Sequence, residues 1–130
     1  MQPKDKLDKM TKIQDFLQEQ AVAQDQKSLW FEMKGIRVYT RAGPMVSYTP
    51  GFSVIKAMCV SNVTVTGALR TGIFSKFAEE AIAFCKPLGF VEFQIENVIS
   101  FEMLGYCEKH KMLMKRAEYG SYGNSYWLSI

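Results

Sequence analysis

The sequence predicts a mixed α/β domain built on a central mixed sheet, and three observations lead to this prediction. Hydrophobic residues make up 48% of the 130 residues and charged residues 22%, as in folded globular domains of ordinary size. Segments of period-two hydrophobicity alternate with segments whose apolar residues recur every three or four positions. One helical segment lies between two strongly apolar strands, as in a βαβ unit. We therefore treat residues 1–130 as a single domain.

The first predicted element is an amphipathic helix over about residues 5–27. Its apolar side chains share one face, on a charged and Gln-rich background, and are Leu7, Met10, Ile13, Phe16 and Leu17. We expect the helix to dock on the sheet through this stripe. A frayed N-terminal arm is the alternative, because Gln-rich polar faces also occur in extensions.

Three strands are predicted next, over 29–33, 36–41 and 52–65. The second (IRVYTR) alternates apolar and polar residues, and Gly43 and Pro44 predict a turn after it, with another turn at Pro50 and Gly51. The third strand is largely apolar on both faces, which predicts an interior position covered on both sides. Its alternation breaks near Ser61 and Asn62, which predicts a β-bulge or a splay of the strands there.

A βαβ unit accounts for the centre of the chain. A helix is predicted over 75–86, ended by Pro87 and Gly89, and the strand 90–98 (FVEFQIENV) alternates cleanly. With the strand 52–65, they form a right-handed crossover with parallel strands. Ser100 is the predicted N-cap of a further helix that runs to about residue 110. The segments 112–116 and 125–128 are predicted to form a closing hairpin.

Composition and charge exclude several classes of protein. The net charge of +3 is too small for a nucleic-acid-binding surface, so no nucleic-acid partner is expected. No apolar run approaches the ~20 residues of a membrane helix, and no apolar segment follows the polar start, which predicts a cytoplasmic protein without a membrane partner. The three cysteines show no CxxC spacing, so neither a structural metal site nor a disulfide framework is expected.

The basic residues are spread along the sequence, apart from one loose group, which is Lys109, His110, Lys111, Lys115 and Arg116. We interpret it as a solvated helix end and strand edge in preference to a phosphate site.

The segment VTVTGALRTGIFSKFAEEA carries the most chemical information, because it places Arg70, Gly72 and a helix start directly after a buried strand. Backbone N–H groups of residues 71–75 have no helical acceptors, and the helix dipole adds positive charge at this end. An anion such as a pyrophosphate would be held there. A tight turn in which Gly72 only relieves crowding is the alternative, and the residues alone leave both open.

The run of residues 36–114 resembles the GNAT family of N-acetyltransferases, in particular the compact acetyltransferase-like proteins of phages and bacteria. SNVTV followed by RTGIFSKF is similar to the family's strand and pyrophosphate loop, which reads Gln/Arg-x-x-Gly-x-Gly/Ala. FVEFQIENV resembles the next strand, and SFEMLGYCEKHKM resembles the closing helix. The resemblance covers roughly 80 of the 130 residues, with the cofactor-binding core at about 52–111.

The resemblance implies a GNAT-type acyl-CoA N-acyltransferase fold and acetyl transfer from acetyl-CoA to an amine of a small molecule or protein. It implies that the backbone of Val63 and Val65 holds the pantetheine arm, as an added strand would. The remaining cofactor-binding positions that it implies are Arg70, Thr71, Gly72, Ile73, Phe74, Ser75 and Ser100, the last at the position of a family Asn.

Two catalytic roles follow from the implied chemistry. Deprotonation of the amine requires a carboxylate near the split between the central strands, and Glu96 is the first candidate, with Glu92 second. The leaving thiolate needs a proton donor, for which Cys107 and Tyr106 are the candidates. The alternatives are that Glu96 faces solvent, that Cys107 is a buried inert thiol and that Tyr106 only packs.

Three positions depart from the family pattern. Arg70 or Thr71 stands where a second glycine is usual, Cys107 takes the place of the catalytic tyrosine, and Lys111 replaces the glycine that ends the helix. These departures support an alternative function as a non-catalytic, GNAT-like phage accessory or inhibitor protein that acts through protein contacts. Small members of the fold are often dimeric, which makes a homodimer through the C-terminal aromatics (Tyr119, Tyr122, Tyr126 and Trp127) a further hypothesis.

Overall fold

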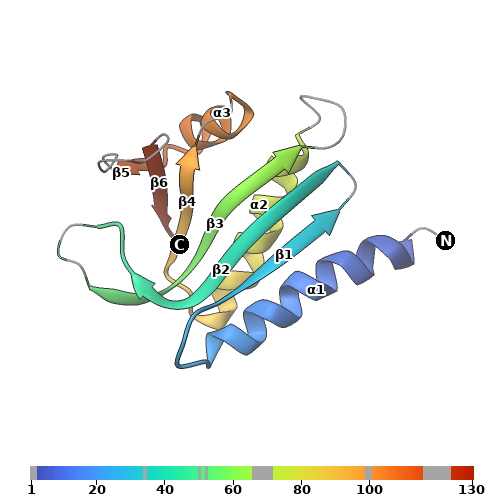
Figure 1. The fold of residues 1–130 in the computed structure, drawn as a ribbon, viewed down its shortest axis with the longest axis horizontal. Helices are drawn as coiled ribbons and strands as arrows, with labels where there is room; N and C mark the ends of the chain where they lie inside the picture. Colours follow the sequence, from blue (N-terminus) through green and yellow to red (C-terminus); the bar gives the residue numbers. More distant parts are fainter. Residues whose placement is uncertain are drawn as a thin grey trace.

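The computed structural model describes residues 3–33, 35–49, 51, 53–65, 72–98, 101–115 and 124–130. The order of helices and strands agrees with the one that the sequence predicts (Figure 1). The elements are α1 (Pro3–Ala21), β1 (Lys27–Met33), β2 (Ile36–Val46), β3 (Val54–Val65), α2 (Ile73–Cys85), the short 3-10 helix η1 (Lys86–Leu88), β4 (Glu92–Val98), α3 (Phe101–Lys109), β5 (Leu113–Lys115) and β6 (Asn124–Ser129).

The strands form one six-stranded sheet in the order β1-β2-β3-β4-β6-β5. β3 and β4 pair in parallel, and every other neighbouring pair is antiparallel. The parallel pair is connected through α2, so the predicted βαβ unit and the predicted mixed α/β class are both confirmed. β5 and β6 pair as the predicted closing hairpin.

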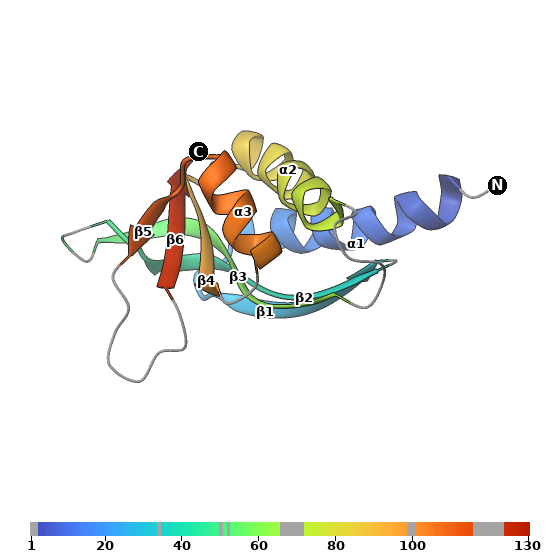
Figure 2. The same ribbon diagram turned by 90° about the horizontal axis from the view of Figure 1, so that it is seen from above.

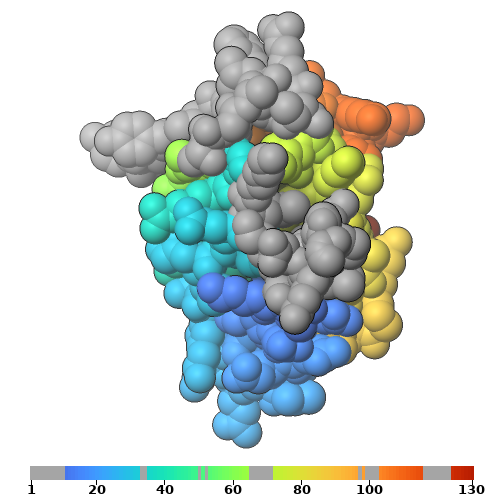
Figure 3. Space-filling view, turned by 90° about the vertical axis from the view of Figure 1, so that its right-hand side faces the viewer, coloured from blue at the N-terminus to red at the C-terminus, as the bar shows by residue number. Residues whose placement is uncertain are grey.

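The helices cover one face of this sheet. Figure 2 shows α1 and α2 on the same side of the strands, and Figure 3 shows α1 between β1 and α2. The described part of the apolar stripe of α1 docks as predicted, because Ile13 and Leu17 are fully buried in a core shared with Phe31 of β1 and Phe77 of α2. The side chains of Leu7 and Met10 lie outside the described residues. In the described ranges, no helix is long and apolar enough to span a membrane.

The predicted helix over 5–27 is wrong at its C-terminal end, because α1 ends at Ala21 and β1 begins at Lys27. Gln20 is buried, and its Nε2 donates hydrogen bonds to the carbonyl oxygens of Ala42 at 2.9 Å and Asp25 at 3.0 Å. These bonds fasten the segment after the helix to β2, so the chain turns back there.

The predicted turn at Gly43 and Pro44 is also wrong, because β2 continues through both residues to Val46. β1 pairs with β2 only as far as Ala42, so Pro44 lies on a segment with a single neighbouring strand, where proline is tolerated. Gly43 has a φ of 126°, and a Cβ there would lie 3.0 Å from Cα of Gln26. The close approach of two backbones explains this glycine.

The predicted bulge in β3 is confirmed at Ser61. Tyr39 pairs with Asn62 and Thr40 with Val60, so Ser61 is the extra residue. Before the bulge, Met58 and Val60 pack into the core beneath the helices. The intervening residues of β3 face the other side of the sheet, where Ala57 and Cys59 are buried with Met45. Residues 57–60 of the strand are therefore buried on both faces, as predicted, whereas Val54, Asn62 and Thr64 are exposed. Pro50 and Phe52, part of the predicted turn and strand, and Arg116 of the predicted hairpin lie outside the described residues.

Candidate functional site

β3 and β4 pair over only four residues and then diverge. Ala57–Val60 pairs with Glu92–Ile95, after which β3 continues to Val65 and β4 to Val98 (Figure 1). Val63 and Val65 lie on the diverging part of β3, where their partners are Val38 and Ile36 of β2. Within the described ranges, the side of this segment that faces β4 has no strand paired to it. Both residues expected to bind the cofactor through their backbone thus lie beside an unpaired strand edge.

The N-terminus of α2 follows the end of β3. Gly72 has a φ of 72° at the N-cap, and a Cβ built there would have no heavy atom within 4 Å. The glycine is therefore required by its left-handed conformation, and not by crowding. Backbone N–H groups at the start of a helix lack intrahelical acceptors, and among the described residues no side chain caps this end.

The other residues expected to bind the cofactor are placed as follows. Ile73 and Ser75 are partly exposed in the first turn of α2, whereas the Phe74 side chain is buried and offers only its backbone. Arg70, Thr71 and Ser100 lie outside the described residues.

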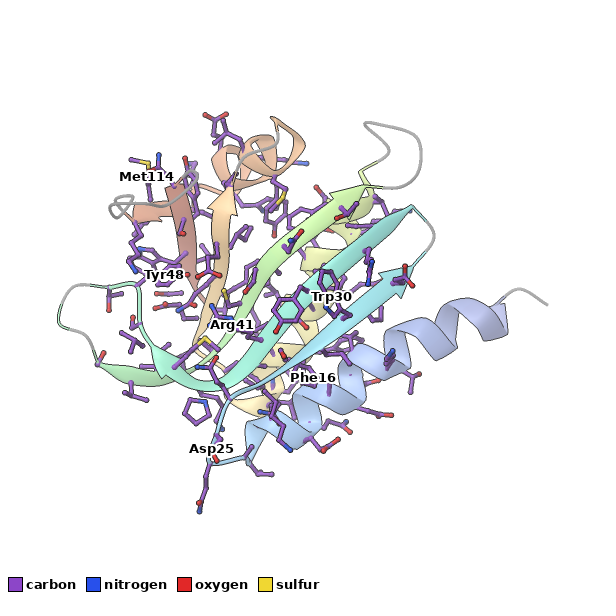
Figure 4. The ribbon with its side chains drawn as sticks, viewed as in Figure 1. Phe16, Asp25, Trp30, Arg41, Tyr48 and Met114 are labelled. Atoms are coloured by element: carbon purple, nitrogen blue, oxygen red, sulfur yellow. The ribbon has the colours of Figure 1, made fainter. Side chains whose placement is uncertain are left out.

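A polar cluster lies on the face of the sheet opposite the helices (Figure 4). Arg41 of β2 extends across β3, and its Nε donates to Oγ of Ser61 at 3.0 Å. Its Nη2 lies 3.3 Å from both carboxylate oxygens of Glu96 on β4. The same nitrogen lies 3.6 Å from Sγ of Cys59. Three neighbouring strands thus contribute to one charged site.

Glu96 lies at the point where the strands part, because the preceding residue, Ile95, is the last β4 residue paired with β3. Its side chain is 34% exposed and that of Arg41 is 30% exposed. The carboxylate that the sequence suggested first as a general base is therefore accessible and beside the unpaired edge of β3.

Glu92, the second candidate base, has a different environment. It is 3% exposed and accepts hydrogen bonds from Oγ of Ser47 at 2.7 Å, Nε2 of Gln94 at 2.7 Å and the backbone N–H of Tyr48 at 2.9 Å. These donors bind the segment after β2 to the start of β4. The geometry gives Glu92 a structural role.

Tyr106 and Cys107 of α3 are both enclosed in the core. The Tyr106 ring packs edge-on against Phe74 at a centroid distance of 5.3 Å and lies 4.2 Å from the His110 ring. Burial raises the pKa of Tyr106 to about 12 and that of Cys107 to about 12. Both therefore remain protonated at neutral pH.

The cysteines are all free thiols, and each is buried. In the part of the chain that the structure describes, no three His, Cys, Asp or Glu side chains are grouped so that they could hold a metal ion. Cys59 lies near polar groups: Oγ of Ser61 is 3.8 Å from its sulfur and the Tyr48 hydroxyl 3.9 Å. Burial raises the pKa of the Cys59 thiol, and the charge of Arg41 opposes this rise.

Sequence reasoning did not identify Arg41, Tyr48 or Cys59 as members of the site. The alternation in IRVYTR indicates that Arg41 faces away from the apolar side, which is the one relevant pattern. Its partner Glu96 lies 55 residues away, so only the pairing of β2, β3 and β4 brings them together.

Solved structures that resemble this chain include two GNAT proteins. The GNAT domain of S. lividans PAT matches with a TM-score of 0.53 and 16% identity, over 82% of this chain and 61% of that one. An acetyltransferase of the GNAT family from Streptococcus pneumoniae matches with a TM-score of 0.52 and 17% identity, over 89% of this chain and 73% of that one. No protein-family model and no curated protein matches the sequence. The chain thus has a GNAT-type fold, as the sequence resemblance predicted, and spans 61% of the length of the S. lividans domain.

Proposed function

We propose that this GNAT-fold chain transfers an acetyl group from acetyl-CoA to an amine. The observation that carries the proposal is the position of Glu96, an accessible carboxylate where β3 and β4 diverge. Beyond it lie the edge of β3 that has no paired strand in the described ranges and the N-terminus of α2, which no described side chain caps. The carboxylate can act as the base for the amine. The strand edge can bind an extended chain that carries amides, and the helix N-terminus can bind an anionic group.

The chain's own residues would hold the cofactor in two parts. Backbone groups of Val63 and Val65 would bind the amides of the pantetheine arm as an added strand does. Backbone N–H groups of residues 72–75 would bind the pyrophosphate, with Arg70 supplying a full positive charge and Thr71 and Ser100 completing the set. When bound, acetyl-CoA supplies the activated thioester.

Glu96 would accept a proton from the ammonium form of the acceptor. The freed nitrogen lone pair then attacks the thioester carbonyl carbon, a C–N bond forms and the C–S bond breaks. The departing thiolate gains a proton from a donor on the chain, and the extra proton of the nitrogen restores that donor. Glu96 releases its proton to solvent, so one proton is released for each acetyl group transferred. Tyr106 or Cys107 would supply the thiolate's proton, because a phenol and a thiol both carry a proton at neutral pH.

Calorimetric titration with acetyl-CoA, and with CoA alone, tests the cofactor part of the proposal. We expect micromolar binding that is abolished in Arg70→Glu and in Gly72→Asp, because each places negative charge where an anion would bind. Arg37→Glu is the matched control, because Arg37 lies on β2 over the Trp30 ring at 4.4 Å and should leave binding unchanged. Unchanged affinity in both test variants would overturn the proposal.

A second candidate function is a non-catalytic, GNAT-like accessory or inhibitor protein, of phage type as the sequence resemblance suggested. The observation that favours it is the enclosure of both proposed proton donors, since Tyr106 is 4% exposed and Cys107 fully buried. Thiol release from acetyl-CoA in the presence of amines separates the two functions. Release above the rate without amine supports the transferase, and cofactor binding without release supports the second candidate.

Oligomeric state is a separate proposal. A homodimer through the C-terminal aromatics would use Tyr126 and Trp127, which are both partly exposed on β6. Tyr119 and Tyr122 lie outside the described residues. Sedimentation of the purified chain tests it.

A further inference from the structure

We infer, building on the proposed acetyl transfer, that the acceptor is an α-amino acid, with Arg41 binding its carboxylate and Glu96 its amine. The two side chains put opposite charges side by side, with Nη2 of Arg41 3.3 Å from the Glu96 oxygens. In an α-amino acid the ammonium and carboxylate groups share one carbon. The adjacent charges of the ligand and of the protein can therefore pair head to tail.

The Arg41–Glu96 pair is incomplete as an ion pair, which leaves capacity for a ligand. A saturated arginine–carboxylate pair uses two nitrogens at about 2.7–2.9 Å. Here a single nitrogen contacts both oxygens, and the contacts are longer, at 3.3 Å. Among the described residues, Nη1 has one hydrogen-bond contact, with the exposed side chain of Gln26 (Oε1 at 3.5 Å). Nη1 of the guanidinium can thus donate hydrogen bonds to a second carboxylate without the loss of a strong existing bond.

The exposure of the pair points the same way. Side chains of Arg41 and Glu96 are 30% and 34% exposed, whereas Glu92 nearby is 3% exposed and has three short hydrogen bonds. A partly exposed ion pair contributes little to stability, so its separation by a ligand has a small cost. The pair is therefore suited to binding, whereas Glu92 is suited to holding the fold.

The charge balance of the site selects among amines. The positive charge of Arg41 lies beside the only carboxylate at this point of the described structure, so a simple amine or polyamine meets repulsion as well as attraction. A zwitterion meets complementary charge at both ends. Hydroxyl groups of Ser61 and Tyr48 lie close to the pair and provide further polar contacts.

Thiol release measured with matched acceptors tests the inference. The pairs are phenylalanine with phenethylamine, leucine with isopentylamine, and lysine with cadaverine, which differ only in the α-carboxylate. For at least one pair we expect kcat/KM for the amino acid to exceed that for the amine by about tenfold or more, the size of one charged hydrogen bond. Equal or opposite preferences in all three pairs would overturn the inference.

The Arg41→Gln variant should lose this preference through a raised KM for the amino acid, with acetyl-CoA affinity unchanged. Arg37→Gln is the matched control, because Arg37 lies on the same face of β2 as Arg41. Its side chain lies 4.0 Å from Glu32 and does not contact Glu96. A preference retained in Arg41→Gln contradicts the inference. If that variant does not fold, Arg41→Lys keeps the charge and loses the planar fork, and should show an intermediate preference.

Failure of the proposed transfer would be recognised separately. If no amine of either kind releases thiol, acetyl transfer fails, and the same matched pairs are titrated against the protein by calorimetry. Binding of an amino acid, but not of its amine, that is lost in Arg41→Gln would still support the zwitterion site. Absence of any such difference would overturn it.

Discussion

Arg41 on β2 reaches across β3 to Glu96 on β4, although the two residues are 55 positions apart in the sequence. The contact spans three strands at the level where the parallel pair separates. It holds the carboxylate from the β2 side of the sheet. The Glu96 side chain is 34% exposed, so it is also accessible from solvent.

Glu96→Gln should lower kcat for acetyl transfer by about 100-fold or more, because an amide cannot accept the proton of the acceptor. Its oxygen can still accept from Arg41, so folding and acetyl-CoA affinity should remain unchanged. Steady-state kinetics and calorimetric titration measure the two effects. A kcat within twofold of the wild-type value would remove Glu96 from the mechanism.

Glu92→Gln should lower the free energy of unfolding by about 1–3 kcal/mol, because one of its three donors then faces an NH2 group. Urea denaturation measures this change. Glu80→Gln, on the exposed face of α2, is the control and should stay within about 0.5 kcal/mol of the wild type. Equal midpoints for the two variants would show that the buried carboxylate does not stabilise the fold.

Two glycine substitutions should change stability in opposite directions. Gly72→Ala should destabilise by about 1–2 kcal/mol, because φ is 72° and an L side chain is strained in that conformation even where space is free. Gly105→Ala, inside α3 and also without a neighbour within 4 Å, should stabilise by up to about 1 kcal/mol through helix propensity. Thermal or urea unfolding measures both, and the same sign for the two contradicts this explanation.

Alkaline pH should destabilise the protein through its buried thiols. Burial raises the pKa of Cys85 and of Cys107 from 9.0 to about 12 in the folded state. Between these values the folded protein retains protons that the unfolded chain has lost. The free energy of unfolding should therefore fall with rising pH, by about 1.4 kcal/mol per pH unit for each thiol, and the full stabilisation is present below pH 9.

Urea denaturation at several pH values from 7.5 to 10.5 would measure this slope. Cys85→Ala removes one thiol and should show a shallower slope, whatever its stability at pH 7.5. The same slope in that variant and in the wild type would attribute the alkaline effect to other groups.

The order of elements was predictable because it depends on local periodicity, and the limits of elements were not. A helix continuing to residue 27 fits the polar sequence, but the buried Gln20 amide fastens the chain to β2 and ends the helix near Ala21. Gly43 and Pro44 have the composition of a turn, and they occur inside β2 because β1 stops opposite Ala42. Both errors come from long-range contacts that local composition does not contain.

The candidate site was predictable only in part, for the same reason. Glu96 could be suggested from the strand FVEFQIENV and the expected split beside it. Arg41 could not, because its relevance depends on the register of β2 with β3 and of β3 with β4. Glu92 and Glu96 lie four residues apart on one strand and look equivalent in the sequence. The hydrogen bonds from Ser47, Tyr48 and Gln94 give Glu92 its structural role.

The position of β6 between β4 and β5 has a consequence for how the sheet assembles. β5 precedes β6 in the chain, but in the described sheet it pairs with β6 alone, through Leu113–Lys115. During synthesis, β5 therefore has no strand of the described sheet to pair with until β6 has been synthesised. The first three strands, by contrast, pair in chain order and can form a meander at once. The last strand to be synthesised thus takes an inner position in the sheet, between β4 and the edge strand β5.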